Sequence, residues 1–188
     1  MEGYQKVIDG ERMVVENYKP IIHIDPDWPL VKLGEIFDNS TDSIKPADQN
    51  GIVKYISLAN IESETGKIVG DLDTEISEIK STKKIYHLGD ILYGKLRPNL
   101  NKTHLSYHEG ICSTDILVLR KVNDTIIPEF YLPILRSDDI NERVLLGVSG
   151  AQLPRVGWKY MSSLLLPLPS IDIQKSNAEV IQEEQNLI

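Results

Sequence analysis

The sequence predicts a mixed α/β fold, in which a globular domain with a mixed or antiparallel sheet lies between long N- and C-terminal helices. Strand-length apolar runs alternate with helical patterns through the middle of the chain, and apolar residues recur at helical spacing at both ends. Of the 188 residues, 41% are apolar, which suffices for a proper core in one domain or one domain with an appendage.

The first predicted element is a helix over residues 2–18. Its apolar residues recur at helical spacing, and they are Tyr4, Val7, Ile8, Val14, Val15 and Tyr18. Pro20 is expected to stop it. A second long helix is expected after Ser170, a good N-cap, with one face made of Ile171, Ala178, Ile181 and Ile188. Each helix has one apolar stripe, which favours pairing in a coiled coil or bundle.

The middle of the chain predicts strands and short helices in alternation. An apolar-rich segment over 28–37 opens it, and strands are then expected over 52–58, 85–93 with a break at Gly89, 114–119 and 164–168. Helices are expected from Pro128, because proline suits a first turn, and over 138–146 and 158–163. The segment 147–152 between the last two is rich in small residues and reads as a flexible loop.

The charge is unevenly distributed. The whole chain has a net charge of −8, residues 35–78 carry −7, and residues 79–159 carry +4. Within 80–102 the only acidic residue is Asp90, against six cations, which are Lys80, Lys83, Lys84, Lys95, Arg97 and Lys102. A basic surface on an acidic protein is a footprint for a polyanion, since a phosphate feels the local potential. The alternative is a solvated face of mixed charge.

The basic loop after Gly94 is the most informative segment. Lys95, Arg97 and Lys102 alternate with Pro98, Asn99 and Asn101, which form turns and carry hydrogen-bonding amides. Arginine can bind guanine and asparagine can bind adenine through paired hydrogen bonds. This loop is therefore a candidate for reading base edges, while Lys80, Lys83 and Lys84 suit phosphates better. The alternative for each residue is an ordinary surface position.

No catalytic or metal site is predicted. The chain lacks a phosphate-binding glycine motif, its histidines show no convincing ligand spacing, and Cys112 has no neighbouring base and cannot form an internal disulfide. We therefore expect a non-catalytic protein without cofactors. No apolar run approaches the ~20 residues of a membrane helix, and the N-terminus lacks a signal-peptide pattern, so a cytoplasmic protein is expected.

Four segments in order resemble the target recognition domain of the specificity subunits of type I restriction-modification systems. They are Trp28–Ile36, Gly89–Leu92, Cys112–Arg120 and Leu166–Gln174. The terminal segments resemble the end and the beginning of that family's spacer helix. The resemblance implies a spacer helix over 1–19, a DNA target recognition domain over 20–169 and a second spacer helix over 170–188.

The resemblance also implies a function. The chain is expected to read one half of a bipartite double-stranded DNA site and to dock the methyltransferase subunits, and through them the restriction subunit. It adds Ser149, Gly150, Gln152 and Arg155 to the expected DNA contacts. A homodimer through the helices is a further expectation, with contacts from Tyr4, Val7, Ile8, Val14, Val15, Ile181 and Ile188.

Two alternatives remain open at this point. One is a protein-interaction scaffold that binds through its helices and the acidic segment 35–78. The other is the recognition domain of a fused restriction-modification enzyme whose catalytic parts lie outside this sequence.

Overall fold

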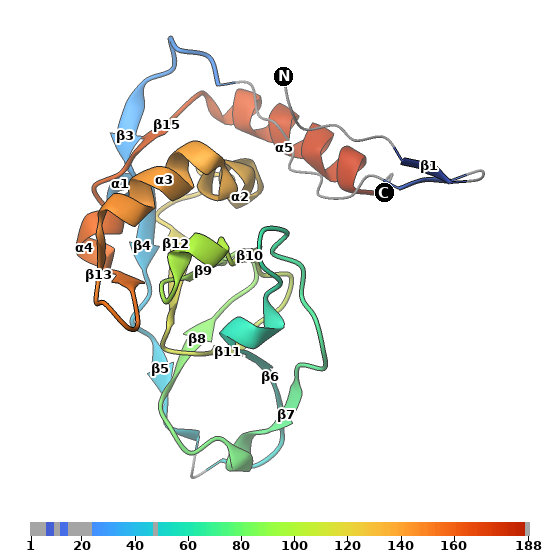
Figure 1. Ribbon diagram of the computed structural model, residues 1–188, viewed down its shortest axis with the longest axis vertical. Helices are drawn as coiled ribbons and strands as arrows, with labels where there is room; N and C mark the ends of the chain where they lie inside the picture. The colour runs from blue at the N-terminus through green and yellow to red at the C-terminus, as the bar shows by residue number, and fades with distance from the viewer. Residues whose placement is uncertain (1–6, 10–11, 15–23, 47–48, 187–188) are drawn as a thin grey trace.

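The computed structural model describes residues 7–9, 12–14, 24–46 and 49–186, with side chains for 24–46 and 49–180. Two sheets form its framework (Figure 1). The four-stranded sheet contains β10 (Thr103–Leu105), β9 (Ile91–Gly94), β12 (Ile116–Lys121) and β4 (Phe37–Asn39), in that order. The five-stranded sheet contains β5 (Ser43–Ile44), β8 (Lys83–Tyr86), β11 (Gly110–Cys112), β6 (Ile52–Ile56) and β7 (Asp73–Glu75).

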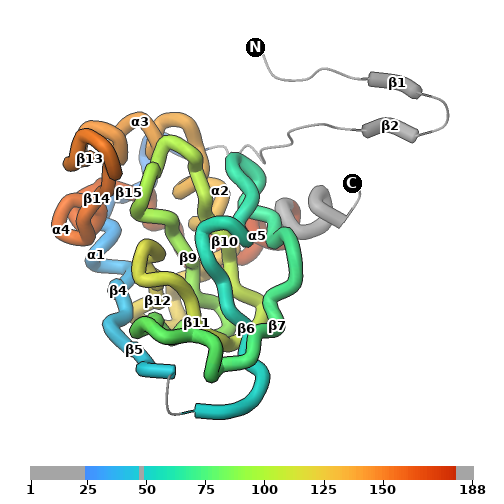
Figure 2. The backbone as a smooth tube through the Cα atoms, turned by 60° about the horizontal axis from the view of Figure 1, so that its bottom comes forward, coloured from blue at the N-terminus to red at the C-terminus, as the bar shows by residue number. Residues whose placement is uncertain are grey.

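Both sheets are largely antiparallel, and the expected mixed α/β class is confirmed. In the five-stranded sheet, which Figure 2 brings forward, only β11 and β6 run parallel among the described strands. The two strands predicted over 85–93 exist as β8 and β9, and Gly89 lies in the turn between them with φ 84°. They do not form a pair, however, because β8 belongs to the five-stranded sheet and β9 to the four-stranded sheet. The positive φ explains the glycine, because other residues rarely adopt that conformation.

The four-stranded sheet is buried on both faces. Alternate residues of β12 enter different apolar clusters: Leu117 and Leu119 pack with the helices, whereas Ile116 and Val118 pack with Ile56 of the five-stranded sheet. Side chains alternate across a strand, so a strand buried on both faces must be apolar throughout. This explains the continuous run that predicts a buried strand here.

Helices cover one face of that sheet. They are α1 (Leu33–Ile36), α2 (Pro128–Arg136), α3 (Asp138–Leu146) and α4 (Trp158–Met161), and α2 and α3 begin where the sequence predicts. Pro128 occupies the first turn of α2, and Ser137 caps α3 by accepting the Ile140 N–H at 3.3 Å. β15 (Leu165–Pro167) then pairs with β3 (Leu30–Lys32), and β13 (Val148–Ser149) pairs with β14 (Arg155–Val156).

The predicted N-terminal helix is wrong for the six of its residues that are described. Val7–Asp9 and Arg12–Val14 form β1 and β2, an antiparallel pair. The sequence holds a physical reason: Asp9 pairs with Arg12, a glycine directly after Asp9 suits a two-residue hairpin turn, and Val7, Ile8 and Val14 are β-branched. Tyr4 and Val15 of the expected helix pair lie outside the described residues.

The C-terminal helix is confirmed as α5 (Ile171–Asn186). Ser170 caps it as expected, since its Oγ accepts the Ile173 N–H at 3.5 Å. The expected packing partners of Ile181 and Ile188 stay a prediction, because Ile188 and the side chain of Ile181 lie outside the described part. No helix among the described residues is long and apolar enough to cross a membrane.

Candidate nucleic-acid interface

Two loops that are about sixty residues apart in sequence lie side by side. The Val156 N–H donates to the Lys95 carbonyl at 3.0 Å, and the Arg97 N–H donates to the Pro154 carbonyl at 2.8 Å. Leu96 and Arg155 also form an isolated antiparallel bridge. The loop after β9 and the β13–β14 hairpin, both of which the sequence predicts as DNA contacts, therefore form one continuous surface.

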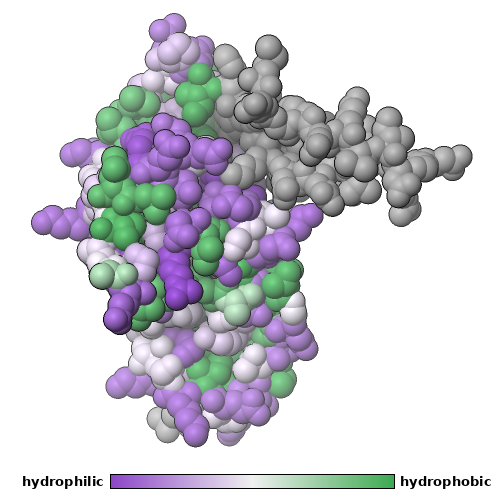
Figure 3. Space-filling view, in the orientation of Figure 1, coloured by the Kyte–Doolittle hydropathy of each residue, from purple (hydrophilic) through white to green (hydrophobic). Residues whose placement is uncertain are grey.

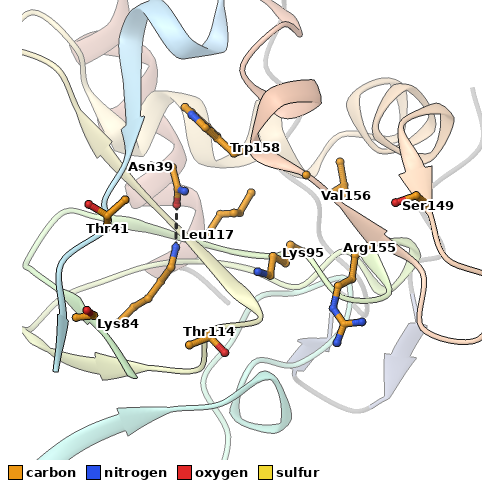
Figure 4. A pocket seen from close by; sticks show the side chains of 12 residues that line it. Asn39, Thr41, Lys84, Lys95, Thr114, Leu117, Ser149, Arg155, Val156 and Trp158 are labelled. Atoms are coloured by element: carbon orange, nitrogen blue, oxygen red, sulfur yellow. Dashed lines mark hydrogen bonds between the residues drawn. The ribbon is translucent and has the colours of Figure 1, made fainter. Parts of the chain in front are cut away.

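A hollow of about 530 Å³ opens beside this surface (Figure 4). Three cations line it from different elements: Lys84 from β8, Lys95 after β9 and Arg155 from β14. Five of the other lining residues are polar, and they are Asn39, Thr41, Ser43, Thr114 and Ser149. The remaining four are Leu117, Val156, Gly157 and Trp158. Cations surrounded by hydroxyl and amide groups suit a phosphate, which accepts hydrogen bonds and carries negative charge.

Neighbouring side chains orient two of these cations. The Lys84 ammonium donates to Asn39 Oδ1 at 3.0 Å, as the dashed line in Figure 4 shows, and burial lowers the pKa of Lys84. Arg155 Nε donates to Asp115 Oδ1 at 3.0 Å. The side chain of Arg155 is 40% exposed, so the guanidinium can still contact a ligand. Lys95 lies between these two cations in Figure 4.

The basic loop presents some predicted residues and buries another. Arg97 and Asn99 are exposed. Arg97 and Asn101 both adopt left-handed backbone conformations, with φ of 51° and 48°. Asn101 is only 2% exposed, and its Nδ2 donates to the Arg136 carbonyl at 2.8 Å. Its burial counts against the expected base contact and assigns Asn101 an internal structural contact instead.

The other predicted residues also differ in their surroundings. Lys80 is exposed but does not line the hollow. Lys83 is 8% exposed, and its ammonium binds Ser81 and lies 5.5 Å from the centre of the Tyr55 ring. This burial counts against a phosphate contact by Lys83. Lys102 is half-buried and donates to the Leu58 carbonyl at 2.7 Å.

The hairpin tip completes the surface. Gly150 and Gln152 are exposed there, and Gly150 has φ 95°. Gly150 therefore permits a turn that other residues would strain. At this tip Gln152 is exposed to solvent, and the hairpin contacts the loop that carries Arg97.

Sequence reasoning missed the polar rim of the hollow. Asn39, Thr41 and Ser43 lie in and after β4, Thr114 precedes β12, and Trp158 begins α4. The signal for the first three is the run of small polar residues over 38–43. A run of this kind is also common in ordinary loops, so the sequence alone does not identify it as part of the site. Only the structure shows that these residues line the hollow together with Lys84.

The described residues offer little catalytic chemistry. Among them, no group of three or more His, Cys, Asp or Glu residues could hold a metal ion. Cys112 is buried, and burial raises the pKa of its thiol to about 12, which suppresses the nucleophilic thiolate.

No family model matches the chain. A curated relative, the EcoDI specificity subunit of a type I restriction enzyme from Escherichia coli, is 24% identical over 169 residues. These residues are 90% of this chain and 36% of the relative. The chain therefore spans little more than a third of the length of that curated relative.

Solved structures show the same relationship. The HsdS subunit from Thermoanaerobacter tengcongensis is 26% identical, with a TM-score of 0.74 over 88% of this chain and 44% of that chain. A structure from a study of type I R-M complex assembly is also 26% identical, with a TM-score of 0.72 over 89% and 44%. An S subunit from M. genitalium, 12% identical with a TM-score of 0.58, shares the fold. In sequence and fold, this chain resembles a single target recognition domain of a type I restriction-modification specificity subunit.

Proposed function

We propose that this chain is a sequence-specific DNA-binding specificity subunit, or part of one, that reads one half of a bipartite site in a type I restriction-modification system. One observation carries the proposal: the Lys95–Asn99 segment and the β13–β14 hairpin are joined by backbone hydrogen bonds beside a cationic hollow. The role is non-catalytic, as in the specificity subunits that the chain resembles.

The surface divides the work of recognition between two kinds of contact. Lys84, Lys95 and Arg155 would hold phosphates, which fixes the position of the duplex. Arg97, Asn99 and Gln152 are exposed next to them and would read base edges. One well-formed pair of hydrogen bonds to a base contributes about 1–3 kcal/mol of discrimination.

The partners follow from the same assignment. The methyltransferase subunit would dock on the helical parts, and the restriction subunit would join through it. A homodimer through the terminal segments would supply a second half-site reader. The separation of the half-sites would then depend on helix length, at about 1.5 Å per residue.

Selection of duplexes from a random library tests this function. The chain is used first alone and then with the methyltransferase subunit encoded with it. Enrichment of a short motif, or of two motifs across a fixed gap, supports a half-site reader. If neither condition enriches a sequence, the proposed function is wrong and the scaffold alternative takes its place.

Arg97→Ala tests the division of work. We expect affinity for the selected duplex to fall by about tenfold or more, with little change for a random duplex, because a base contact carries sequence information and a phosphate contact does not. Lys67→Ala is the control, since Lys67 is exposed, does not line the hollow and is not among the expected DNA contacts. Equal losses on both duplexes would make Arg97 a phosphate contact.

A further inference from the structure

Two buried side-chain amides hold the opposite ends of α2. Gln174, on α5, is 1% exposed and contacts the N-terminal end. Asn101, in the basic loop, is 2% exposed and contacts the C-terminal end. Helix ends leave backbone groups without partners inside the helix, so an amide side chain at each end satisfies groups that would otherwise be costly to bury.

At the N-terminal end, Gln174 supplies a contact that α2 lacks by itself. Ile127 precedes the helix and offers no capping side chain. Gln174 Oε1 accepts the Ile127 N–H at 3.0 Å, and Gln174 Nε2 donates to the Pro169 carbonyl at 3.0 Å. The amide therefore binds α5 and the segment before it to the start of α2.

At the C-terminal end, the amide of Asn101 binds the last carbonyl of the helix. Its Nδ2 donates to the Arg136 carbonyl at 2.8 Å and to Glu64 Oε2 at 3.3 Å. The Arg136 guanidinium in turn donates to the Glu64 carbonyl. The basic loop, the turn over 62–66 and α2 thus meet at one buried polar junction.

The body of α2 is well suited to link these two ends. Phe130, Tyr131 and Leu135 are fully buried, and the Tyr131 hydroxyl donates to the Pro167 carbonyl at 3.1 Å. The helix has nine residues and is therefore about 13 Å long. Pro133 removes one backbone hydrogen bond inside α2, but we expect the helix to move as a rigid body because close-packed interiors resist local deformation.

We propose that α2 is a strut that fixes the basic loop relative to α5, with Gln174 and Asn101 as positioning residues at its two ends. The role of this strut rests on the proposed function. In that function the basic loop reads bases, and α5 belongs to the helical part that sets the distance between half-sites. The strut holds the reading loop in a constant register with that helix.

Amide hydrogen exchange tests the strut without DNA. In Gln174→Met, the buried amide is lost and an apolar side chain of similar length replaces it. We expect exchange of the Arg97, Leu100 and Asn101 amides, at the far end of α2, to rise by about tenfold. Lys175→Met is the control, because Lys175 is exposed on the same helix. Unchanged exchange in the loop of Gln174→Met would overturn the proposal.

DNA discrimination provides the second readout. Asn101→Gly keeps the left-handed backbone, which glycine adopts easily, and removes the side chain with its amide. We expect it to lower the ratio of selected-duplex to random-duplex affinity, whereas general destabilisation would lower both affinities alike. Distant independent substitutions combine multiplicatively. If one strut connects the two sites, the double variant with Gln174→Met loses no more discrimination than the more severe single variant.

These outcomes separate the two proposals. A wild-type chain without sequence preference contradicts the proposed function, and hydrogen exchange still decides whether the strut exists. The strut is contradicted if the double variant loses discrimination multiplicatively and amide exchange in the basic loop of Gln174→Met is normal. That result leaves the proposed DNA reading intact.

Discussion

Neighbouring residues of one type have different roles in this protein. Lys83 and Lys84 are adjacent in β8, yet Lys83 is buried against Tyr55 and Lys84 lines the cationic hollow. The alternation of side chains across a strand accounts for this difference. Asn99 is exposed within the 3-10 turn Pro98–Leu100, whereas Asn101 ends that turn with a left-handed backbone and is buried.

Salt dependence measures the contribution of Lys84. If its ammonium holds a phosphate, Lys84→Met should weaken binding to selected and random duplexes alike, and the slope of log affinity against log salt should become shallower by about 0.9. Lys67→Met serves as the comparison, because Lys67 is exposed and does not line the hollow. An unchanged slope, measured by fluorescence anisotropy at several salt concentrations, would remove Lys84 from the phosphate contacts.

Thiol labelling reports the burial of Cys112. Because burial raises the pKa of the thiol to about 12, the folded protein should not react with iodoacetamide at pH 8, where an exposed cysteine reacts readily. Reaction should follow denaturant unfolding as measured by circular dichroism. The neutral thiol contributes stability below the unfolded pKa near 8.5, and this contribution declines at higher pH. Rapid labelling in buffer alone would contradict the described core.

At the scale of elements, the turn over 62–66 forms part of the buried polar junction between the basic loop and the C-terminal end of α2. A Cβ at Gly66 would lie 2.0 Å from the Thr103 carbonyl oxygen of β10, and Gly66 has φ 67°. Only glycine allows the turn to approach the strand so closely. The position of the basic loop therefore depends on a turn that lies about thirty residues earlier in the sequence.

Substitution of Gly51 and Gly66 separates two contributions to stability, the strain of a positive φ and the steric clash of an added Cβ. Gly51 also has positive φ, at 112°, but its Cβ would meet no atom within 4 Å. We expect Gly51→Ala to cost about 1–2 kcal/mol of unfolding free energy. Gly66→Ala should cost more than Gly51→Ala, because the steric clash adds to the strain. Equal losses in urea denaturation would show that the turn at Gly66 relaxes easily.

At the scale of the whole molecule, one arginine links the two sheets. Arg120, on β12, forms two hydrogen bonds with Asp90, at 3.1 and 2.9 Å, and an ion pair with Asp42 at 2.8 Å, shortly before β5. The side chain of Asp90 is 4% exposed. On the face in Figure 3, hydrophobic residues form separate patches among hydrophilic ones.

Removal of this arginine should destabilise the fold. Arg120→Met leaves the Asp90 carboxylate buried without its main partner, and we expect a loss of about 3–5 kcal/mol in unfolding free energy. Lys121→Met is the matched control, because its pair with Asp124 is at the surface, with Asp124 97% exposed, and solvent screens it, so its loss should change stability little. Similar midpoints for the two variants in denaturation would contradict a structural role for Arg120.

The sequence by itself determined the mixed α/β class, the buried strand β12, both helices α2 and α3 and the cap of α5. These features depend on local periodicity and on residues such as Pro128 and Ser170, whose preferences act within a few positions. It also indicated the loop after β9, whose cations and amides suit nucleic acid, whereas the β13–β14 hairpin was expected from the resemblance to specificity subunits.

Only the tertiary structure decided how those loops meet and which of their side chains are accessible. The contacts between Lys95 and Val156, Lys84 and Asn39, and Asn101 and Arg136 join residues between 35 and 61 positions apart. No local pattern encodes such pairs, since they arise from the packing of complete elements. The burial of Asn101 departed from what its residue type predicted for the same reason. The β1–β2 pair departed from the helical spacing for a local reason, because turn chemistry outweighed that spacing.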